Sequence, residues 1–532
     1  SAASDVYKRQ IKTLIYTVNN IRKVLIYMFK TAAVFSDNMV LQREKNICVW
    51  GEADNGAAVT AELNGKKAEC TANDGKWSLI LPPMPAGGPY ELHIVCRTDS
   101  EESVIFRNVM IGEVWLCGGQ SNMELELQNA KNGKAVLAEL TNDMPVRFYY
   151  TNKVGTVKAA EEAERDSCWG MCDSEGSKAW SAVGFFFARK LAKELGVTVG
   201  LIGCNWGGTS GSAWVDRKTL DINKELNSYL EEYDKAIEGK SVQEQEKEYA
   251  DYLDYDKAWN EKSQEVYKKE PDASWDKVQE LCGENKWPGP INCVNPYRPA
   301  GLFETMLSRV CPYTLRGFLY YQGESDDHKP NTYYTLLTSL ISLWRNIWND
   351  EKLPFIIVQL PMFKYKNDPD YKHWCLIREA QMRAFQTVKN TGIAVITDCG
   401  ELDNIHPTDK LPVGERLCLQ AQKLAYGMNV KAFGPIYSSY EYINGGIKLS
   451  FEYAENGFNV KDEEPIGFEI AGEDKKFYPA KAEITGNTIF ISSEKVSAPV
   501  YARYCWVNYG EVNIYNETGI PLAPFRTHRN DV

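Results

Sequence analysis

The chain has 532 residues, of which 44% are hydrophobic and 25% are charged. This length exceeds one ordinary hydrophobic core, so about two to four domains are expected. The formal net charge is −12 and no basic block occurs, which excludes the positive stripe that a nucleic-acid binder needs to neutralise phosphates.

Residues 1–28 are expected to be a non-native or disordered extension without a function of its own. Basic residues interrupt its apolar positions and no clear small-residue cleavage site follows, so no signal peptide is predicted. The apolar stretch at 24–29 is far too short to span a membrane. The 14 cysteines are scattered, several of them in apolar runs, which favours buried free thiols in a reducing compartment. These features predict a cytoplasmic protein without a membrane partner; its oligomeric state stays open.

Both ends of the chain have the pattern of small β-modules. Short strand-like runs separated by glycine and proline turns predict an N-terminal β-sandwich over 29–108. Similar runs predict a β-rich, sandwich-like module over 434–532. The predicted strands of these modules include 47–50, 58–61, 77–81, 90–95, 488–491 and 501–504.

The middle of the chain, 109–433, alternates apolar strands with amphipathic helices. Helices are predicted at 182–195 and 333–347 from their 3.6-residue period. The predicted strands are 114–117, 197–202, 317–321, 355–358 and 393–396. Near-continuous apolar strands alternating with helices predict an α/β domain with a doubly wound parallel sheet covered on both faces.

A charged stretch rich in Glu, Lys, Tyr and Trp interrupts this rhythm at 217–290. It is expected to be a helical insertion. Two interpretations are open: helices that cap a functional site, or a solvated insertion with no ligand role.

Chemically useful residues follow the predicted strands at the ends where ligands bind in parallel α/β sheets. These strand ends supply a hydroxyl nucleophile, small-residue backbone donors, a side-chain amide, carboxylates and an imidazole. The segments are GGQSNM at 118–123, NWGGT at 205–209, QGESD at 322–326, Asp398, and DNIHP at 403–407.

Ser121, in the first of these segments, also fits a structural pattern. With Glu124 it forms S-x-x-E, the capping box that opens a helix. The two interpretations are compatible, because a helix N-terminus offers free backbone N–H groups and a positive dipole end to an oxyanion. Met123 stands where the second glycine of a G-x-S-x-G elbow would be, which disfavours a lipase-type hydrolase.

A serine hydroxyl needs a base, and the chain has only five histidines. Only His406 follows a core strand on a loop that carries a carboxylate three residues earlier, Asp403. A carboxylate at that spacing could hold the imidazole in the right tautomer. Asp398, at the end of the fifth strand, is the alternative orienting acid.

The strand-end segments resemble the signature blocks of a known family. GQSNM at 119–123, WGGT at 206–209, YQGES at 321–325 and IHP at 405–407 are similar to those of the sialate O-acetylesterase family, within the SGNH (GDSL-like) hydrolases. FSDNMVLQR at 35–43 and PFRT at 524–527 resemble the family's opening β-domain and closing strand. The resemblance implies an SGNH-type doubly wound sheet flanked by the two β-modules.

The resemblance also implies roles for individual residues. Ser121 would be the nucleophile, His406 the general base, and Asp403 the orienting acid. The oxyanion hole would consist of the backbone N–H groups of Ser121 and Gly208 and the side-chain amide of Gln322. Glu324 is expected to support its loop, and Asn205 and Trp206 to form a wall of the site or to pack beneath it.

These roles predict a serine esterase that removes O-acetyl groups from carbohydrates through an acyl-enzyme, without a metal or a cofactor. The resemblance favours an acetylated sialic acid as the substrate; acetylxylan or another glycan is the alternative. A sialate carboxylate would require an arginine in the pocket, and Arg298 is the candidate. The alternative from another class is a non-catalytic carbohydrate-binding protein, which would have no use for Ser121, Gln322 and His406 together.

Overall fold

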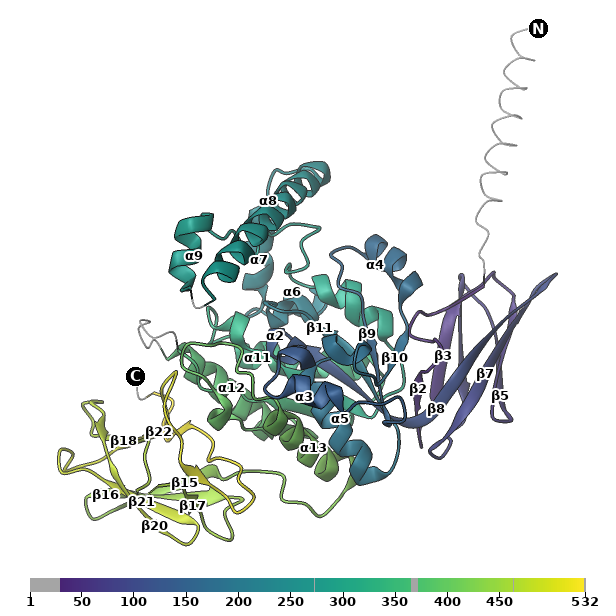
Figure 1. The fold of residues 1–532 in the computed structure, drawn as a ribbon. Coiled ribbons are helices and arrows are strands. Elements are labelled where there is room, and N and C mark those ends of the chain that lie inside the picture. The colour runs from purple at the N-terminus through teal and green to yellow at the C-terminus, as the bar shows by residue number, and fades with distance from the viewer. Residues whose placement is uncertain (1–28, 272, 365–371, 463, 531–532) are drawn as a thin grey trace.

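The computed structural model describes residues 29–271, 273–364, 372–462 and 464–530, so the extension expected at 1–28 lies outside the described residues. The fold is mixed α/β, with a large mixed sheet and further antiparallel sheets. Two β-rich modules lie at opposite ends of the central α/β unit (Figure 1). Within the described ranges, no helix has the length and apolar character needed to cross a membrane.

The central sheet is built outward from its middle strand. Its order is β10 (Trp169–Met171), β9 (Val146–Tyr150), β11 (Val199–Asn205), β8 (Glu101–Gly119), β12 (Gly317–Tyr321), β13 (Phe355–Val358) and β14 (Thr391–Ala394). All neighbours from β9 to β14 pair in parallel, and β10 is an antiparallel edge. Because the chain enters at β8 and extends to both sides, the carboxyl ends of β8, β11 and β12 border one crevice.

The five strands predicted for this sheet are present, two of them with the predicted bounds; the last lies two residues earlier than expected, at β14. Strand β9 was not predicted, because Arg147 interrupts its apolar pattern. The Arg147 guanidinium is buried and donates to the backbone carbonyls of Asn38 (2.8 Å) and Asn108 (2.5 Å) in the N-terminal module. Backbone carbonyls of the N-terminal module therefore bind the Arg147 charge, whose burial without partners would destabilise a core strand.

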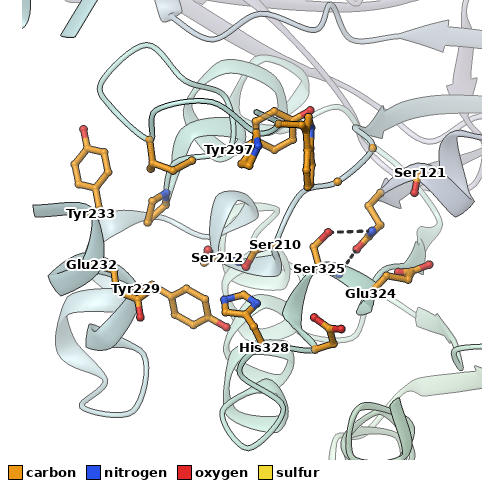
Figure 2. Close-up of a pocket in the computed structure, with 18 of the residues that line it drawn as sticks. Ser121, Ser210, Ser212, Tyr229, Glu232, Tyr233, Tyr297, Glu324, Ser325 and His328 are labelled. Carbon is orange, nitrogen blue, oxygen red and sulfur yellow. Dashed lines mark hydrogen bonds between the residues drawn. The ribbon is translucent and has the colours of Figure 1, made fainter. Parts of the chain in front are cut away.

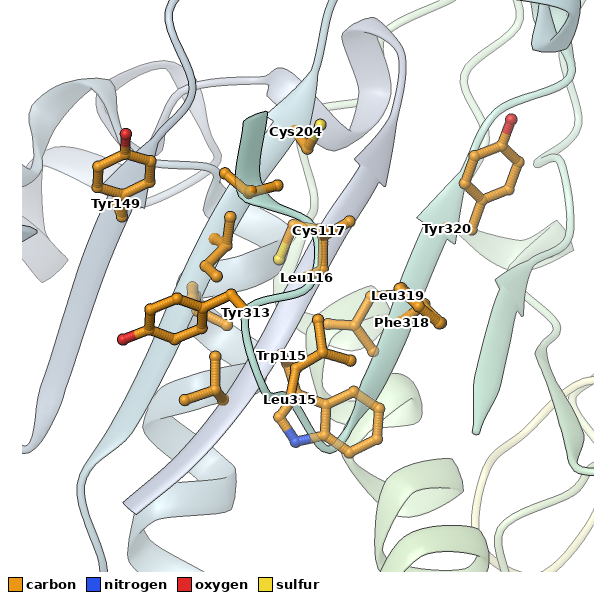
Figure 3. Close-up of a cluster of buried hydrophobic side chains, with 14 of the residues drawn as sticks. Trp115, Leu116, Cys117, Tyr149, Cys204, Tyr313, Leu315, Phe318, Leu319 and Tyr320 are labelled. Carbon is orange, nitrogen blue, oxygen red and sulfur yellow. The ribbon is translucent and has the colours of Figure 1, made fainter. Parts of the chain in front are cut away.

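The helices predicted from periodicity, α5 (Ala182–Leu195) and α11 (Tyr333–Ile347), have the predicted bounds. They cover opposite faces of the sheet: Gly118 of β8 lies against Trp344 of α11, and the neighbouring Cys117 lies against Gly184 of α5. Figure 3 shows buried side chains of β8 and β12 in the core between these layers. The remaining helices of the central unit are α2 (Ser121–Glu124), α3 (Gly133–Ala138), α4 (Val157–Ala163), α10 (Ser308–Val310), α12 (His373–Thr387) and α13 (Leu411–Tyr426).

The N-terminal module shares a strand with the central sheet. The first half of β8 pairs antiparallel with β7 and its second half runs on to Gly119 beside β11 and β12. The domain boundary predicted at residue 109 therefore falls inside one continuous strand. The module's other strands are β1 (Lys30–Thr31), β2 (Val40–Gln42), β3 (Ile47–Glu52), β4 (Ala58–Leu63), β5 (Lys66–Thr71), β6 (Lys76–Leu81) and β7 (Gly87–Arg97).

A buried ion-pair cluster joins the module to the central sheet. Glu113 of β8 is 0% exposed and accepts hydrogen bonds from Gln42 (2.9 Å), Arg43 (2.6 Å) and Arg316 (2.9 Å). Burial raises the pKa of Glu113, but the bonds and charges of the two arginines outweigh it and lower the pKa below its ordinary value. Both parts of the chain therefore supply the partners that keep this buried carboxylate ionised.

The C-terminal module has its own core and two four-stranded antiparallel sheets. The strands predicted at 488–491 and 501–504 are present. Its strands are β15 (Ile436–Ile443), β16 (Gly446–Glu452), β17 (Asn459–Val460), β18 (Phe468–Ala471), β19 (Tyr478–Pro479), β20 (Lys481–Thr485), β21 (Thr488–Ser492), β22 (Tyr501–Tyr504), β23 (Ile514–Tyr515) and β24 (Phe525–Arg526).

The insertion at 217–290 is helical, as predicted. It comprises α6 (Arg217–Ile222), α7 (Asn227–Ile237), α8 (Val242–Lys269) and α9 (Trp275–Cys282). Helix α8 begins with a capping box in which Ser241 and Glu244 bond reciprocally (3.2 and 2.7 Å). Helices α7, α8 and α9 project from the central unit, away from both β-modules (Figure 1).

Candidate active site

Ser121 and His406 come together at the carboxyl end of the central sheet. Ser121 is the first residue of α2, directly after β8, and His406 lies on the loop between β14 and α13. The Ser121 Oγ atom is 2.8 Å from His406 Nε2. This is the distance at which an imidazole can accept the proton of a serine hydroxyl.

The capping box suggested by Ser121 and Glu124 is not formed, since the start of α2 has no side-chain cap. Glu124 instead accepts a hydrogen bond from the backbone N–H of Gly207 (2.6 Å) and forms an ion pair with Lys153. Its carboxylate thereby fixes the glycine loop after β11 beside Ser121. Gly208, the next residue of that loop, has a φ of +74°, which favours glycine.

Two backbone N–H groups beside the hydroxyl have no acceptor. Ser121 and Gly208 both line the same cavity, and neither N–H donates to another residue that the structure describes. Backbone N–H groups that the fold holds in place without an acceptor can donate hydrogen bonds to the oxyanion of a tetrahedral intermediate.

The structure does not bring the Gln322 amide to this position. Gln322 is buried, and its Nε2 atom donates to Asp326 Oδ2 (2.6 Å), the Thr209 carbonyl (3.2 Å) and Gln120 Oε1 (3.2 Å). The residue is not part of the cavity lining. The oxyanion role expected for Gln322 therefore has no support, because a buried carboxylate binds the amide behind the loop.

The carboxylate that binds the Gln322 amide is Asp326, to which the sequence pattern assigned no role. It is fully buried and accepts hydrogen bonds from the Ser210 hydroxyl (2.6 Å), the Gly211 N–H (2.8 Å) and the Tyr229 hydroxyl (2.9 Å). It thus ties the glycine loop to α7 of the insertion. The available signal was its place in QGESD after β12, but an aspartate in such a loop more often faces solvent.

Neither predicted orienting acid contacts His406. Asp398 is paired with both terminal nitrogens of Arg416 (2.6 and 2.8 Å). Asp403 is exposed, and within the described part of the chain no hydrogen bond or ion pair joins it to the imidazole. The loop turns on Asn404, whose Oδ1 accepts the His406 backbone N–H (3.0 Å). This turn leaves Asp403 on the solvent side.

A buried polar network holds the histidine loop instead. The Asn122 side chain donates to Glu324 Oε1 (2.6 Å) and to the carbonyl of Ile405 (2.9 Å), and it accepts from Lys410 Nζ (2.6 Å). Asn122, Glu324 and Lys410 are all buried. One side chain next to Ser121 thus fixes the residue before His406, and Glu324 acts within this network.

Burial changes the protonation of the groups around the pair. It lowers the pKa of Lys410 to about 7 and raises the pKa of Glu324. The pKa of His406 is lowered, first by partial burial and then by the positive charge of Lys410, while Glu124 acts in the opposite direction. The imidazole is thereby kept neutral, as a general base must be.

We expect the acid limb of kcat/KM to lie below pH 6.5, the ordinary pKa of histidine. Lys410 is protonated in that range, so Lys410→Met should raise the pKa of His406 and move the limb to higher pH. Profiles for 4-nitrophenyl acetate in both proteins would check this, with thermal unfolding as the control for folding. An unmoved limb in a folded variant would contradict the electrostatic link.

A cavity of about 800 Å³ lies in front of the pair. The insertion supplies much of its wall, including Tyr229, Glu232 and Tyr233 of α7 and the ring of Trp287. Figure 2 shows the three α7 side chains across the cavity from Ser121. Of the two interpretations of residues 217–290, the geometry therefore favours helices that cap the site.

Two residues considered for substrate contact lie outside the lining. Asn205 is fully buried and joins β8 to β11 and β9 through the Cys117 carbonyl (3.0 Å) and the Tyr150 hydroxyl (2.9 Å). Trp206 packs against Tyr297, with ring centroids 6.2 Å apart. Since Tyr297 lines the cavity, Trp206 supports the wall from behind.

Arg298 is not placed to bind a ligand. It is buried and donates to the carbonyls of Gly155 (2.7 Å) and Asn295 (3.1 Å) and to Glu304 (2.9 Å). It does not line the cavity. The carboxylate-binding role considered for Arg298 is therefore not supported, because its guanidinium is used to hold two loops together.

The chain is similar to known proteins over most of its length. The family model described as carbohydrate esterase, sialic acid-specific acetylesterase matches residues 111–268 and 294–422. The sialate O-acetylesterases of Mus musculus and Homo sapiens are both 26% identical to the chain over 93% of its length, covering 94% and 92% of their own. The crystal structure of a novel carbohydrate acetylesterase from Xanthomonas citri superposes with a TM-score of 0.74 at 28% identity, over 94% of this chain and 99% of that one. The resemblance seen in the motif blocks is confirmed.

Proposed function

The chain belongs to the carbohydrate esterase family of sialic acid-specific acetylesterases, and we propose that it removes O-acetyl groups from sugars through Ser121 and His406. The observation that carries the proposal is the 2.8 Å contact between Ser121 Oγ and His406 Nε2 at the wall of a cavity. Relatives named as a sialate O-acetylesterase and as a carbohydrate acetylesterase, each similar over almost the whole chain, support the reaction class.

In the proposed reaction, Ser121 Oγ attacks the acetyl carbonyl while His406 Nε2 accepts the hydroxyl proton. The backbone N–H groups of Ser121 and Gly208 stabilise the oxyanion, each by about 3 kcal/mol. The tetrahedral intermediate then expels the sugar oxygen, which takes the proton from His406. Water attacks the acetyl-enzyme with His406 again as the base, and acetate leaves as Ser121 regains its proton.

We further propose that the central sheet has the SGNH arrangement. The nucleophile follows the middle strand β8, the glycine loop follows β11, and the base follows the last strand β14. These three positions are those of the blocks 119–123, 206–209 and 405–407, which resemble the family's signature blocks. In this arrangement the catalytic unit is a Ser121–His406 pair, and Asn122 positions the base through the Ile405 carbonyl.

A fluorophosphonate, which reacts covalently with activated serines, tests this proposal. The protein is expected to release acetate from 4-nitrophenyl acetate and from O-acetylated sugars, and one phosphonate should be found on Ser121 by peptide mass spectrometry. His406→Gln should slow labelling strongly because the hydroxyl loses its base. Labelling of another serine, or full activity in a protein labelled at Ser121, would contradict the assignment.

A further inference from the structure

The described side chains that line the cavity in front of Ser121 include several acidic groups. Its lining, as far as the structure describes it, includes the carboxylates of Glu232, Glu324 and Asp327 and no lysine or arginine. The basic groups that line it are two imidazoles, His328 and His406. Binding sites for carboxylates in proteins normally provide a guanidinium or an ammonium, and the lining residues that the structure describes provide neither.

The ammonium group that pairs with the lining residue Glu232 is already occupied. Lys329 is largely buried; its Nζ atom lies 2.7 Å from Glu232 Oε1 and donates to Ser228 Oγ at 3.2 Å. It also lies over the ring of Tyr229, 4.4 Å from the centroid. A carboxylate that entered the cavity would have to compete with Glu232 for this charge.

The surfaces that remain are aromatic. Trp287 is 51% exposed and its ring lies directly against Gly208, where an added Cβ would come within 2.2 Å of it. Tyr297 meets it edge to face, with centroids 5.5 Å apart, and Tyr233 lies on the insertion side. Flat apolar rings next to the proposed oxyanion donors suit the C–H faces of an uncharged sugar ring.

We propose that the sugar whose acetyl ester this protein cleaves is uncharged, and that a sugar carrying a carboxylate, such as a sialic acid, is a poor substrate. This inference rests on the proposed function and refines its substrate class. A sugar carboxylate would have to displace Glu232 from Lys329 and would meet the negative charge of Asp327, which repels it, whereas the carboxylates of the lining accept hydrogen bonds from sugar hydroxyls.

The test compares a 9-O-acetylated sialic acid with its methyl ester, a pair that differs in one charge, and adds an O-acetylated methyl xyloside as a second uncharged sugar, with acetate release as the readout. We expect kcat/KM for the methyl ester and the xyloside to exceed that for the free acid at least about tenfold. Because exposed charges are screened by salt, high ionic strength should reduce the difference between acid and ester.

Glu232→Gln provides a matched variant, since it keeps the shape of the side chain and releases Lys329. It should raise the ratio of kcat/KM for the acid to that for the ester severalfold. A free acid hydrolysed as well as or better than its ester, while 4-nitrophenyl acetate is cleaved normally, would overturn the inference alone. Failure to release acetate from every substrate, 4-nitrophenyl acetate included, would overturn the proposed function as well.

Discussion

Replacing Ser121 by alanine is expected to lower kcat/KM for acetyl esters by at least about 10⁴-fold, the order of loss that follows removal of a serine nucleophile. Among the described residues, the Ser121 hydroxyl is the hydrogen-bond partner of His406 Nε2, so the base activates this atom to form the acyl-enzyme. The fold should survive, because the Ser121 side chain makes no helix-capping bond. Acetate release and thermal unfolding, measured on one preparation, would separate the two effects.

Ser325→Ala is the matched control for this variant. Ser325 lines the same cavity, but its hydroxyl accepts a hydrogen bond from the Gln120 amide (3.2 Å), and it lies apart from Ser121 (Figure 2). Its loss should change kcat/KM by less than about tenfold, as expected for one neutral hydrogen bond. Equal losses in both variants would show that Ser121 acts through the shape of the cavity and is not the nucleophile.

Replacing Asn122 by alanine is expected to give the largest loss of stability, about 3 kcal/mol in the free energy of unfolding. The change leaves the Lys410 ammonium and the Glu324 carboxylate buried without the amide that bonds both. It also releases the Ile405 carbonyl, so the imidazole should lose its fixed position. In the fraction that folds, kcat should fall by about 10²-fold, since a misplaced base costs that order of rate, while KM changes little.

Asn129→Ala is the control for the stability measurement, because Asn129 is exposed and bonds only with Glu126 (3.2 Å). It should cost less than about 1 kcal/mol. Urea unfolding of both variants gives the stability difference, and kcat and KM below the transition give the effect on catalysis. If Asn122→Ala keeps a normal kcat, the network holds the fold together without positioning His406.

The parts of the site predicted from sequence are those that follow directly from sheet topology. In a parallel sheet every strand ends at the same edge, so identifying the strands was enough to bring Ser121, Gly208 and His406 to one place. No side-chain geometry was needed for that step. Local rules also gave the bounds of α5, whose cap Ser181 accepts the Gly184 N–H (3.0 Å) and whose last turn ends at Gly196.

The parts that were not predicted depend on which partner a polar side chain finds in the folded core. Gln322 follows the expected strand but is bound by Asp326, and Asp398 is bound by Arg416. Spacing in a sequence does not reveal such competition. Lys410 was given no role because a lysine is normally solvated, and only the fold encloses it.

The continuous strand β8 limits how this protein can be shortened. An isolated catalytic piece that begins at residue 109 would start partway along the strand that carries the nucleophile, and would lack β2, which pairs with Met110–Gly112. It would also lose Gln42 and Arg43, leaving Glu113 with fewer partners for a buried charge. The cut would expose an unprotected strand edge, a common start of aggregation. The smallest recombinant fragment that keeps Ser121 in place therefore includes the N-terminal module.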